Sequence, residues 1–163
     1  MVWAEQLTVA VDSALRDRLT TELALHRRIA KLRERGRHGI PKLIAVLDGC
    51  DAGRGGHSWL ERRYLELVAA DGLPKPVTQA VLARAGDRSV RVDCHFAGTP
   101  VVVELLGYHW HRTEAQMSRD AERLNALAVR GYVPLQFTYR QVTTAPRQVM
   151  RATKDALLPH LRG

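Results

Sequence analysis

Two carboxylates and two histidines occur close together near the middle of the chain: Asp93, Glu104, His109 and His111. Carboxylate oxygens are ligands that Mg²⁺ accepts, with waters or phosphate oxygens completing its shell. An imidazole titrates near neutral pH, so a histidine beside a metal-bound phosphate can act as general base or acid. A lone histidine more often packs against a neighbour or is solvated. The clustering with two acids favours metal-assisted hydrolysis of a phosphate ester.

The spacing of the two acids predicts that they face each other across a β-hairpin. If residues 97–100 form the turn, Phe96 pairs with Val101 and Asp93 lies directly opposite Glu104 on one face. Cβ atoms at such positions are about 4.5–5.5 Å apart, where two like charges destabilise the strands unless something compensates them. A divalent cation is the natural compensation. The alternative is a pair of surface carboxylates with arginine partners on a solvated strand face.

The elements that must position these residues follow from periodicity and turn signals. A capping-box pattern, Ser58-Trp-Leu-Glu61, predicts a helix over about 58–71. Gly131 is expected to be the C-cap of a long helix. The remaining predicted elements are strands over 77–83, 89–96, 101–106 and 132–138, and helices over about 114–130 and 146–161. The order αβββαβα predicts an α/β fold with a central mixed sheet flanked by helices.

The N-terminal part is predicted to be a separate helical extension. Residues 7–35 are expected to be helical, with Thr20 or Thr21 capping a second helix, and residues 40–47 a short helix. The glycine-rich run 48–56 predicts a loop. We therefore expect a basic helical N-terminal segment over residues 1–50 and the main domain over residues 57–163.

The chain is strongly basic, with 25 Lys and Arg against 17 Asp and Glu and a net charge of +8. Nearly all of the cations are arginine, whose planar guanidinium suits phosphate, although a GC-rich genome gives the same bias regardless of function. Position is more informative. Arg119, Arg123 and Arg130 fall on one face of the predicted helix 114–130, away from its apolar side, with Arg112 just before it. We expect these arginines to contact DNA phosphates.

Other features restrict the compartment and the kind of site. Cys50 and Cys94 lie far apart, which favours a reducing cytoplasm over a disulfide scaffold. No apolar run reaches the ~18–20 residues of a membrane helix, and the N-terminus lacks the order of a signal peptide. A zinc site built from Cys50, His57, Cys94, His95 and the later histidines ranks last, because no Cys-x-x-Cys or His-x-x-x-His spacing occurs.

Several motifs together resemble a known nuclease family. Around the acids they read Arg91-Val-Asp93, Val103-Glu104-Leu-Leu-Gly107 and Trp110-His111. Further matching pieces are Ser58-Trp-Leu-Glu61, Gly72-Leu-Pro-Lys-Pro-Val-Thr-Gln79, Arg119-Asp120 with Arg123, and Gly131-Tyr-Val-Pro-Leu-Gln-Phe-Thr138. This ordered set, over about residues 57–160, resembles the very-short-patch-repair-type (Vsr-like) endonucleases, a branch of the PD-(D/E)XK nuclease superfamily.

The resemblance implies a PD-(D/E)XK-like core and hydrolysis of DNA phosphodiester bonds that depends on Mg²⁺ or Mn²⁺. It implies Asp93 as the principal metal ligand and Glu104 as the second strand carboxylate, with the carbonyl of Leu105 as a further ligand. Relatives often carry an upstream winged-helix or antitoxin-like segment, of which the N-terminal part would be a remnant or a truncated form.

The resemblance also implies roles for residues outside the two strands. His111 matches the catalytic histidine, while His109 is a weaker candidate because the matching position is commonly aromatic. Glu61 would be the helix carboxylate that completes the site. A capping-box glutamate, however, would be occupied with the backbone of Ser58 and would need no catalytic role.

The second strand departs from the family pattern in one respect. Uncharacterised relatives usually read Glu-x-Asp-Gly, whereas this chain has Glu104-Leu-Leu106-Gly107, so one carboxylate is missing. That departure favours an alternative, a catalytically lapsed nucleic-acid-binding module such as the regulatory part of a toxin–antitoxin pair. The retained Asp93, Glu104 and His111 favour a DNA endonuclease or nickase. Cleavage of both strands would need two such sites, as a homodimer provides.

Overall fold

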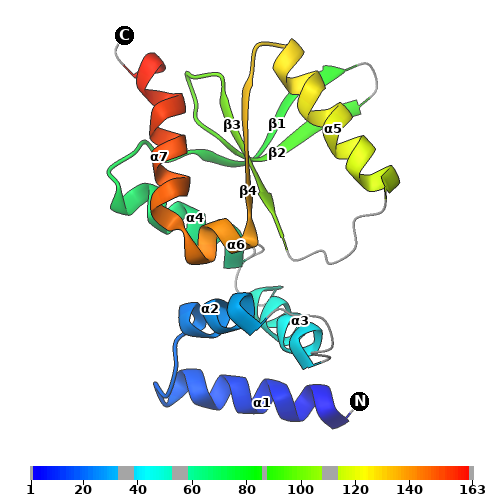
Figure 1. Cartoon of the computed structure of the whole chain (residues 1–163), viewed down its shortest axis with the longest axis vertical. Helices are drawn as coiled ribbons and strands as arrows, with labels where there is room; N and C mark the ends of the chain where they lie inside the picture. The colour runs from blue at the N-terminus through cyan, green and yellow to red at the C-terminus, as the bar shows by residue number, and fades with distance from the viewer. Residues whose placement is uncertain (1, 33–38, 53–58, 86–87, 108–113, 162–163) are drawn as a thin grey trace. The chain divides into compact units, whose positions relative to one another are not determined.

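The computed structural model describes residues 2–32, 39–52, 59–85, 88–107 and 114–161. The chain divides into two compact units, Met1–Arg62 and Arg63–Gly163. The division falls within a helix, whereas the expected domains end at residue 50 and begin at residue 57. Those domain boundaries stay a prediction. Figure 1 shows both units, which are described separately below. In the part of the chain that the structure describes, no helix is both long and apolar enough to cross a membrane.

The first unit is helical, as the sequence predicts. It contains α1 (Val2–Arg16), α2 (Glu22–Leu32), α3 (Gly39–Ala52) and the first residues of α4 (Trp59–Ala70). The hydroxyl of Thr21 accepts a hydrogen bond from the amide of Ala24 at 3.1 Å, so Thr21 caps α2. Within the same unit His26 of α2 stacks on Trp59 with ring centroids 3.7 Å apart.

The glycine-rich run 48–56 differs from its prediction. Residues 48–52 continue α3 and do not begin a loop, while residues 53–56 lie outside the described part. One glycine inside a helix costs about 1 kcal/mol relative to alanine, which the neighbouring helical hydrogen bonds can outweigh. The prediction from glycine content alone therefore placed the end of α3 too early in the sequence.

The second unit is built on a four-stranded mixed sheet. Its strands are β1 (Val77–Ala85), β2 (Arg88–His95), β3 (Val101–Leu106) and β4 (Val133–Thr138), in the spatial order β1-β2-β3-β4. The first three are antiparallel neighbours, and β3 pairs with β4 in parallel. The helices are α4, α5 (Glu114–Val129), α6 (Tyr139–Thr144) and α7 (Pro146–Leu157), followed by the 3₁₀ turn η1 (Leu158–His160). The predicted α/β fold with a mixed sheet flanked by helices and a helical N-terminal part is confirmed.

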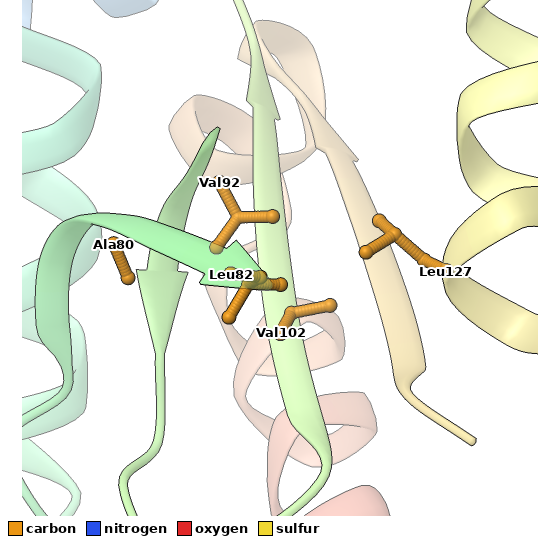
Figure 2. Packing of buried hydrophobic residues seen from close by; sticks show 5 residues of the cluster. All are labelled: Ala80, Leu82, Val92, Val102 and Leu127. Atoms are coloured by element: carbon orange, nitrogen blue, oxygen red, sulfur yellow. The ribbon is translucent and has the colours of Figure 1, made fainter. Parts of the chain in front are cut away.

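Strand β3 lies inside the sheet and is covered on both faces (Figure 1). Five of its six residues are buried. On one face Val102 joins a core cluster with Leu127 of α5 and with residues of β1 and β2, Ala80, Leu82 and Val92 (Figure 2). On the other face Phe137 of β4, which pairs with Leu105, lies 6.0 Å from the Tyr64 ring of α4. A polar side chain on β3 is therefore shielded from solvent.

Helix α6 was not predicted. It begins directly after β4, because Thr138 is both the last residue of the strand and the N-cap of the helix. The Thr138 hydroxyl accepts from the Gln141 amide at 3.2 Å, and the Gln141 side chain accepts from the Thr138 amide at 2.9 Å. This capping box is present in the sequence as Thr-x-x-Gln, but a helix of six residues gives too little periodicity to reveal it.

Gly131 ends α5, as predicted from the sequence. Its φ is +81°, its amide donates to the Ala128 carbonyl at 3.0 Å, and the Tyr132 amide donates to the Leu127 carbonyl at 3.1 Å. These bonds form a Schellman motif, which requires the left-handed conformation that glycine adopts at little cost. The motif turns the chain from α5 directly into β4.

Gly131→Ala is expected to lower the free energy of unfolding by about 1 kcal/mol, because a Cβ is strained at positive φ. Urea unfolding of the two proteins measures the difference. Gly107→Ala is the matched control, since Gly107 has no positive φ and no atom within 4 Å of an added Cβ. A Gly131→Ala variant as stable as the control would show that the motif tolerates a side chain.

Candidate active site

The two acids meet as the register predicts. The Phe96 amide donates to the Val101 carbonyl at 3.1 Å, and His95 pairs with Val102. Continuing this register places Asp93 opposite Glu104. The backbone ladder does not continue that far, since its last pair is Cys94 with Val103. Beyond this pair, the Asp93 side chain accepts the hydrogen bond from the backbone of β3.

The Asp93 carboxylate bridges its two neighbouring strands. Its Oδ2 accepts a hydrogen bond from the Leu105 amide of β3 at 2.7 Å. Its Oδ1 lies 3.5 Å from Nε2 of Gln79 in β1, a long hydrogen bond. The short contact holds the carboxylate beside the backbone that carries Glu104.

Four polar residues occupy neighbouring register positions across the sheet, one from each strand in the order β1 to β4: Gln79, Asp93, Glu104 and Gln136. Glu104 pairs directly with Gln136. Gln79 falls opposite Asp93 because the pairs on either side, Thr78 with Cys94 and Ala80 with Val92, share one register. Side chains alternate along a strand, and the neighbouring Phe137 faces Tyr64 of α4, so Gln136 lies on the α5 face together with Glu104. We call these four residues the polar row.

Glu104 is buried within this row. It is 7% exposed, and its Oε1 accepts from Nη2 of Arg123 in α5 at 2.7 Å. The same Arg123 nitrogen also donates to the Arg91 carbonyl of β2. Burial raises the pKa of Glu104 to about 7. Arg123 lowers this pKa, while the negative charges of Asp93 and Asp120 raise it. A carboxyl group with this pKa gains or loses its proton near neutral pH.

The position of Arg123 corrects one prediction. Arg123 was expected on a face of the helix turned away from its apolar side, but its guanidinium lies over the sheet and binds Glu104. The reason is helical geometry, because Leu127 is buried against the sheet four residues later, and residues four apart share a face. Arg119 and Arg130 are exposed. Glu104 thus has an arginine partner, as expected if the two acids were surface carboxylates without a metal. It is buried, however, and does not lie on a solvated face.

The remaining predicted site residues stay predictions. His109, His111 and Arg112 fall in residues 108–113, outside the described part of the chain. Glu61 lies in the first turn of α4, half-buried and in the first unit, whereas the acid pair is in the second. Its roles as catalytic acid or as capping-box partner of Ser58, itself outside the described part, both stay predictions. So does the metal-ligand role of the Leu105 carbonyl.

The donor set fits one hard divalent cation in part. Mg²⁺ is usually bound by one or two carboxylates and keeps several waters, and Asp93 and Glu104 supply two carboxylates near enough to interact electrostatically. Across the ranges described, no group of three or more His, Cys, Asp or Glu is placed to hold a metal ion. A zinc site at Cys94 and His95 finds no support, because the His95 ring contacts the Thr99 carbonyl at 3.0 Å and the buried Cys94 is on the opposite side of the strand.

Sequence reasoning missed two members of the polar row, Gln79 and Gln136, and the role of Arg123. The signal for Gln136 was the parallel register of β4, which no local pattern reveals. Gln79 could have been found by extending the hairpin register from β2 into β1. The length of that first turn, however, is not evident from its residues.

Comparisons with known proteins find a structural neighbour but no matching sequence family. No protein-family model matches the sequence, and no curated protein matches it. Among solved structures, the chain is similar to the catalytic domain of the homing endonuclease I-Bth0305I. The two are 19% identical with a TM-score of 0.48, and the match covers 62% of this chain and 95% of that one. At this level of similarity we draw no functional conclusion from it.

Proposed function

We propose that the second unit is a Mg²⁺- or Mn²⁺-dependent endonuclease or nickase that hydrolyses DNA phosphodiester bonds. The observation that carries the proposal is that the Asp93 carboxylate is bound by the amide next to Glu104, while Glu104 is buried and has a pKa raised to about 7, in part by the charge of Asp93. Two neighbouring acids are destabilising unless positive charge compensates them, and a divalent cation would add to the charge that Arg123 supplies to Glu104. The motif resemblance to Vsr-like endonucleases of the PD-(D/E)XK superfamily points to the same chemistry.

Each residue of the proposed active site would have a separate role in the reaction. Asp93 and Glu104 would hold the metal, which when bound supplies an activated water and neutralises charge on the phosphate. The Leu105 amide keeps Asp93 in place through its 2.7 Å hydrogen bond. His111, by its matching position, would take or give the proton during attack on phosphorus. Arg119 and Arg130, exposed on and just after α5, would bind the flanking phosphates.

Arg123 supports a second candidate, a nucleic-acid-binding module that no longer cuts. Its guanidinium already supplies positive charge to Glu104 at 2.7 Å. Leu106 stands where the Vsr-like proteins that this chain resembles usually carry a second carboxylate, two residues after Glu104. In such a module the Arg123 guanidinium would neutralise Glu104 in place of a metal ion. The exposed arginines on and just after α5 would still bind DNA.

A plasmid assay separates the two functions. Supercoiled DNA incubated with the protein is expected to be nicked in Mg²⁺ or Mn²⁺ and to remain intact with chelator. His111→Ala is expected to slow nicking about 10²–10⁴-fold, the usual contribution of a general acid or base. His160→Ala, an exposed histidine in η1, is the control and should cut normally.

A different result of the same assay would support the second candidate. DNA binding without cutting in every metal, with the same affinity in His111→Ala, would show that the chain is the binding module.

A further inference from the structure

Gln79 has a backbone conformation that its residue type disfavours. Its φ is +50°, in the interior of strand β1. Left-handed backbone is unfavourable for any residue with a Cβ, and such strain tends to persist where function requires it. The register of β1 with β2 is the same on both sides of Gln79, so the strain does not compensate for a slip at this point.

One other non-glycine residue in the described part of the chain has positive φ, and its case is ordinary. Arg18, with φ of +56°, follows the end of α1. The Leu19 amide there donates to the Ala14 carbonyl at 2.9 Å, and the Arg18 amide to the Leu15 carbonyl at 3.2 Å, which is a helix-terminal motif. Gln79 lies at no helix end, so its conformation needs another reason.

The contact of the Gln79 side chain supplies that reason. Its Nε2 lies 3.5 Å from Oδ1 of Asp93, while the other oxygen of Asp93 is bound by the Leu105 amide at 2.7 Å. The carboxylate is therefore approached from both neighbouring strands of the polar row. A carboxamide orients the acid without changing its charge. An arginine at this position would neutralise the charge that a metal ion needs.

We propose that Gln79 is a positioning residue, which orients the Asp93 carboxylate for metal binding at the cost of a strained backbone. This inference rests on the proposed function and extends it to a residue in β1. A glutamine with a purely structural role would stabilise the fold. A positioning glutamine in a strained conformation lowers stability and raises activity.

Gln79→Gly is the decisive variant, because it removes the amide and relieves the strain together. We expect its unfolding temperature to be equal to or above that of the wild type. Its kcat for plasmid nicking should fall about ten- to a hundredfold, the usual effect of losing a residue that orients a metal ligand, with KM for DNA unchanged. The dissociation constant for Mn²⁺ alone, measured by titration without DNA, should rise by a similar factor.

Arg18→Gly is the matched control, since it relieves the same kind of strain in the first unit. It should raise the unfolding temperature and leave nicking and Mn²⁺ affinity unchanged. Gln79→Asn adds a second test, because asparagine tolerates positive φ and stays uncharged but is one methylene too short to keep the contact with Asp93. Its dissociation constant for Mn²⁺ should rise as in Gln79→Gly, whereas its unfolding temperature should change little.

The outcomes distinguish this inference from the proposed function. If the wild type nicks DNA and Gln79→Gly nicks equally well with the same Mn²⁺ affinity, the positioning role is wrong and the nuclease stands. If Gln79→Gly does not fold, a wild-type affinity for Mn²⁺ in Gln79→Asn overturns the role instead. A wild type that neither nicks DNA nor binds Mn²⁺ overturns both.

Discussion

Asp93→Asn is expected to abolish metal-dependent nicking while the protein remains folded. Asparagine keeps an oxygen that can accept from the Leu105 amide, so the junction of β2 and β3 should persist. It loses the negative charge that would hold the cation. Metal assistance contributes several kcal/mol to such reactions, so the rate should fall about a thousandfold or more. Single-turnover nicking at saturating protein measures this loss apart from DNA affinity.

Two comparisons test whether the charge or the hydrogen bond matters. Asp93→Ala leaves the Leu105 amide without that acceptor and should also lower the free energy of unfolding by about 1–3 kcal/mol. Asp155→Asn, an exposed carboxylate on α7 paired loosely with Arg151 at 3.9 Å, should cut normally. Nicking by Asp93→Asn at the wild-type rate would remove Asp93 from the metal site and with it the proposed mechanism.

Glu104→Gln is expected to change the pH dependence of stability. Because burial raises the pKa of Glu104 in the folded protein to about 7 from the usual 4.5, the folded state holds this proton more tightly than the unfolded state does. Wild-type stability due to this group is therefore greatest below about pH 4.5 and is lost as pH rises towards 7. The loss is on the order of 3 kcal/mol, since each unit of pKa corresponds to about 1.4 kcal/mol.

Glutamine is neutral at every pH, so the variant should not show this decline. Urea unfolding at about pH 5 and about pH 8 should show that the advantage of Glu104→Gln over wild type grows with pH. Nicking should be lost at both values. Glu66→Gln, an exposed partner of Arg63 at 2.8 Å, is the control and should show little such trend. A difference between wild type and Glu104→Gln that is independent of pH would mean that Glu104 titrates normally.

The same proton bears on metal binding. A cation must displace it from Glu104 at neutral pH, so the affinity of the wild type for Mn²⁺ without DNA should fall as pH decreases below about 7.

Much of the second unit could be predicted because its signals are local. The turn at 97–100 sets the register of β2 with β3, and this register brings the two acids to neighbouring positions on adjacent strands. Gly131 marks the end of α5 for the conformational reason that the structure shows. The three antiparallel strands and the long helix follow from patterns within 20 residues or fewer, and the order of the elements determines the mixed sheet.

What could not be predicted depends on contacts between distant segments. A helical wheel assigns Arg123 to a face, but only the docking of α5 decides that its guanidinium reaches Glu104. The raised pKa of Glu104 requires burial on both sides of β3, whereas a sequence shows only that the strand is apolar. The strain at Gln79 has no sequence signal, because no glycine or turn residue beside it marks the position as one of positive φ.

Strand β4 is bracketed by helix-terminal motifs that have a consequence for the polar row. The Schellman motif at Gly131 precedes it by one residue, and the capping box of Thr138 closes it at the other end. Sliding β4 by a single position would break both motifs and would turn Gln136 to the face where Phe137 now packs. The alignment of Gln136 with Glu104 is therefore locked from outside the sheet, by hydrogen bonds that involve neither residue.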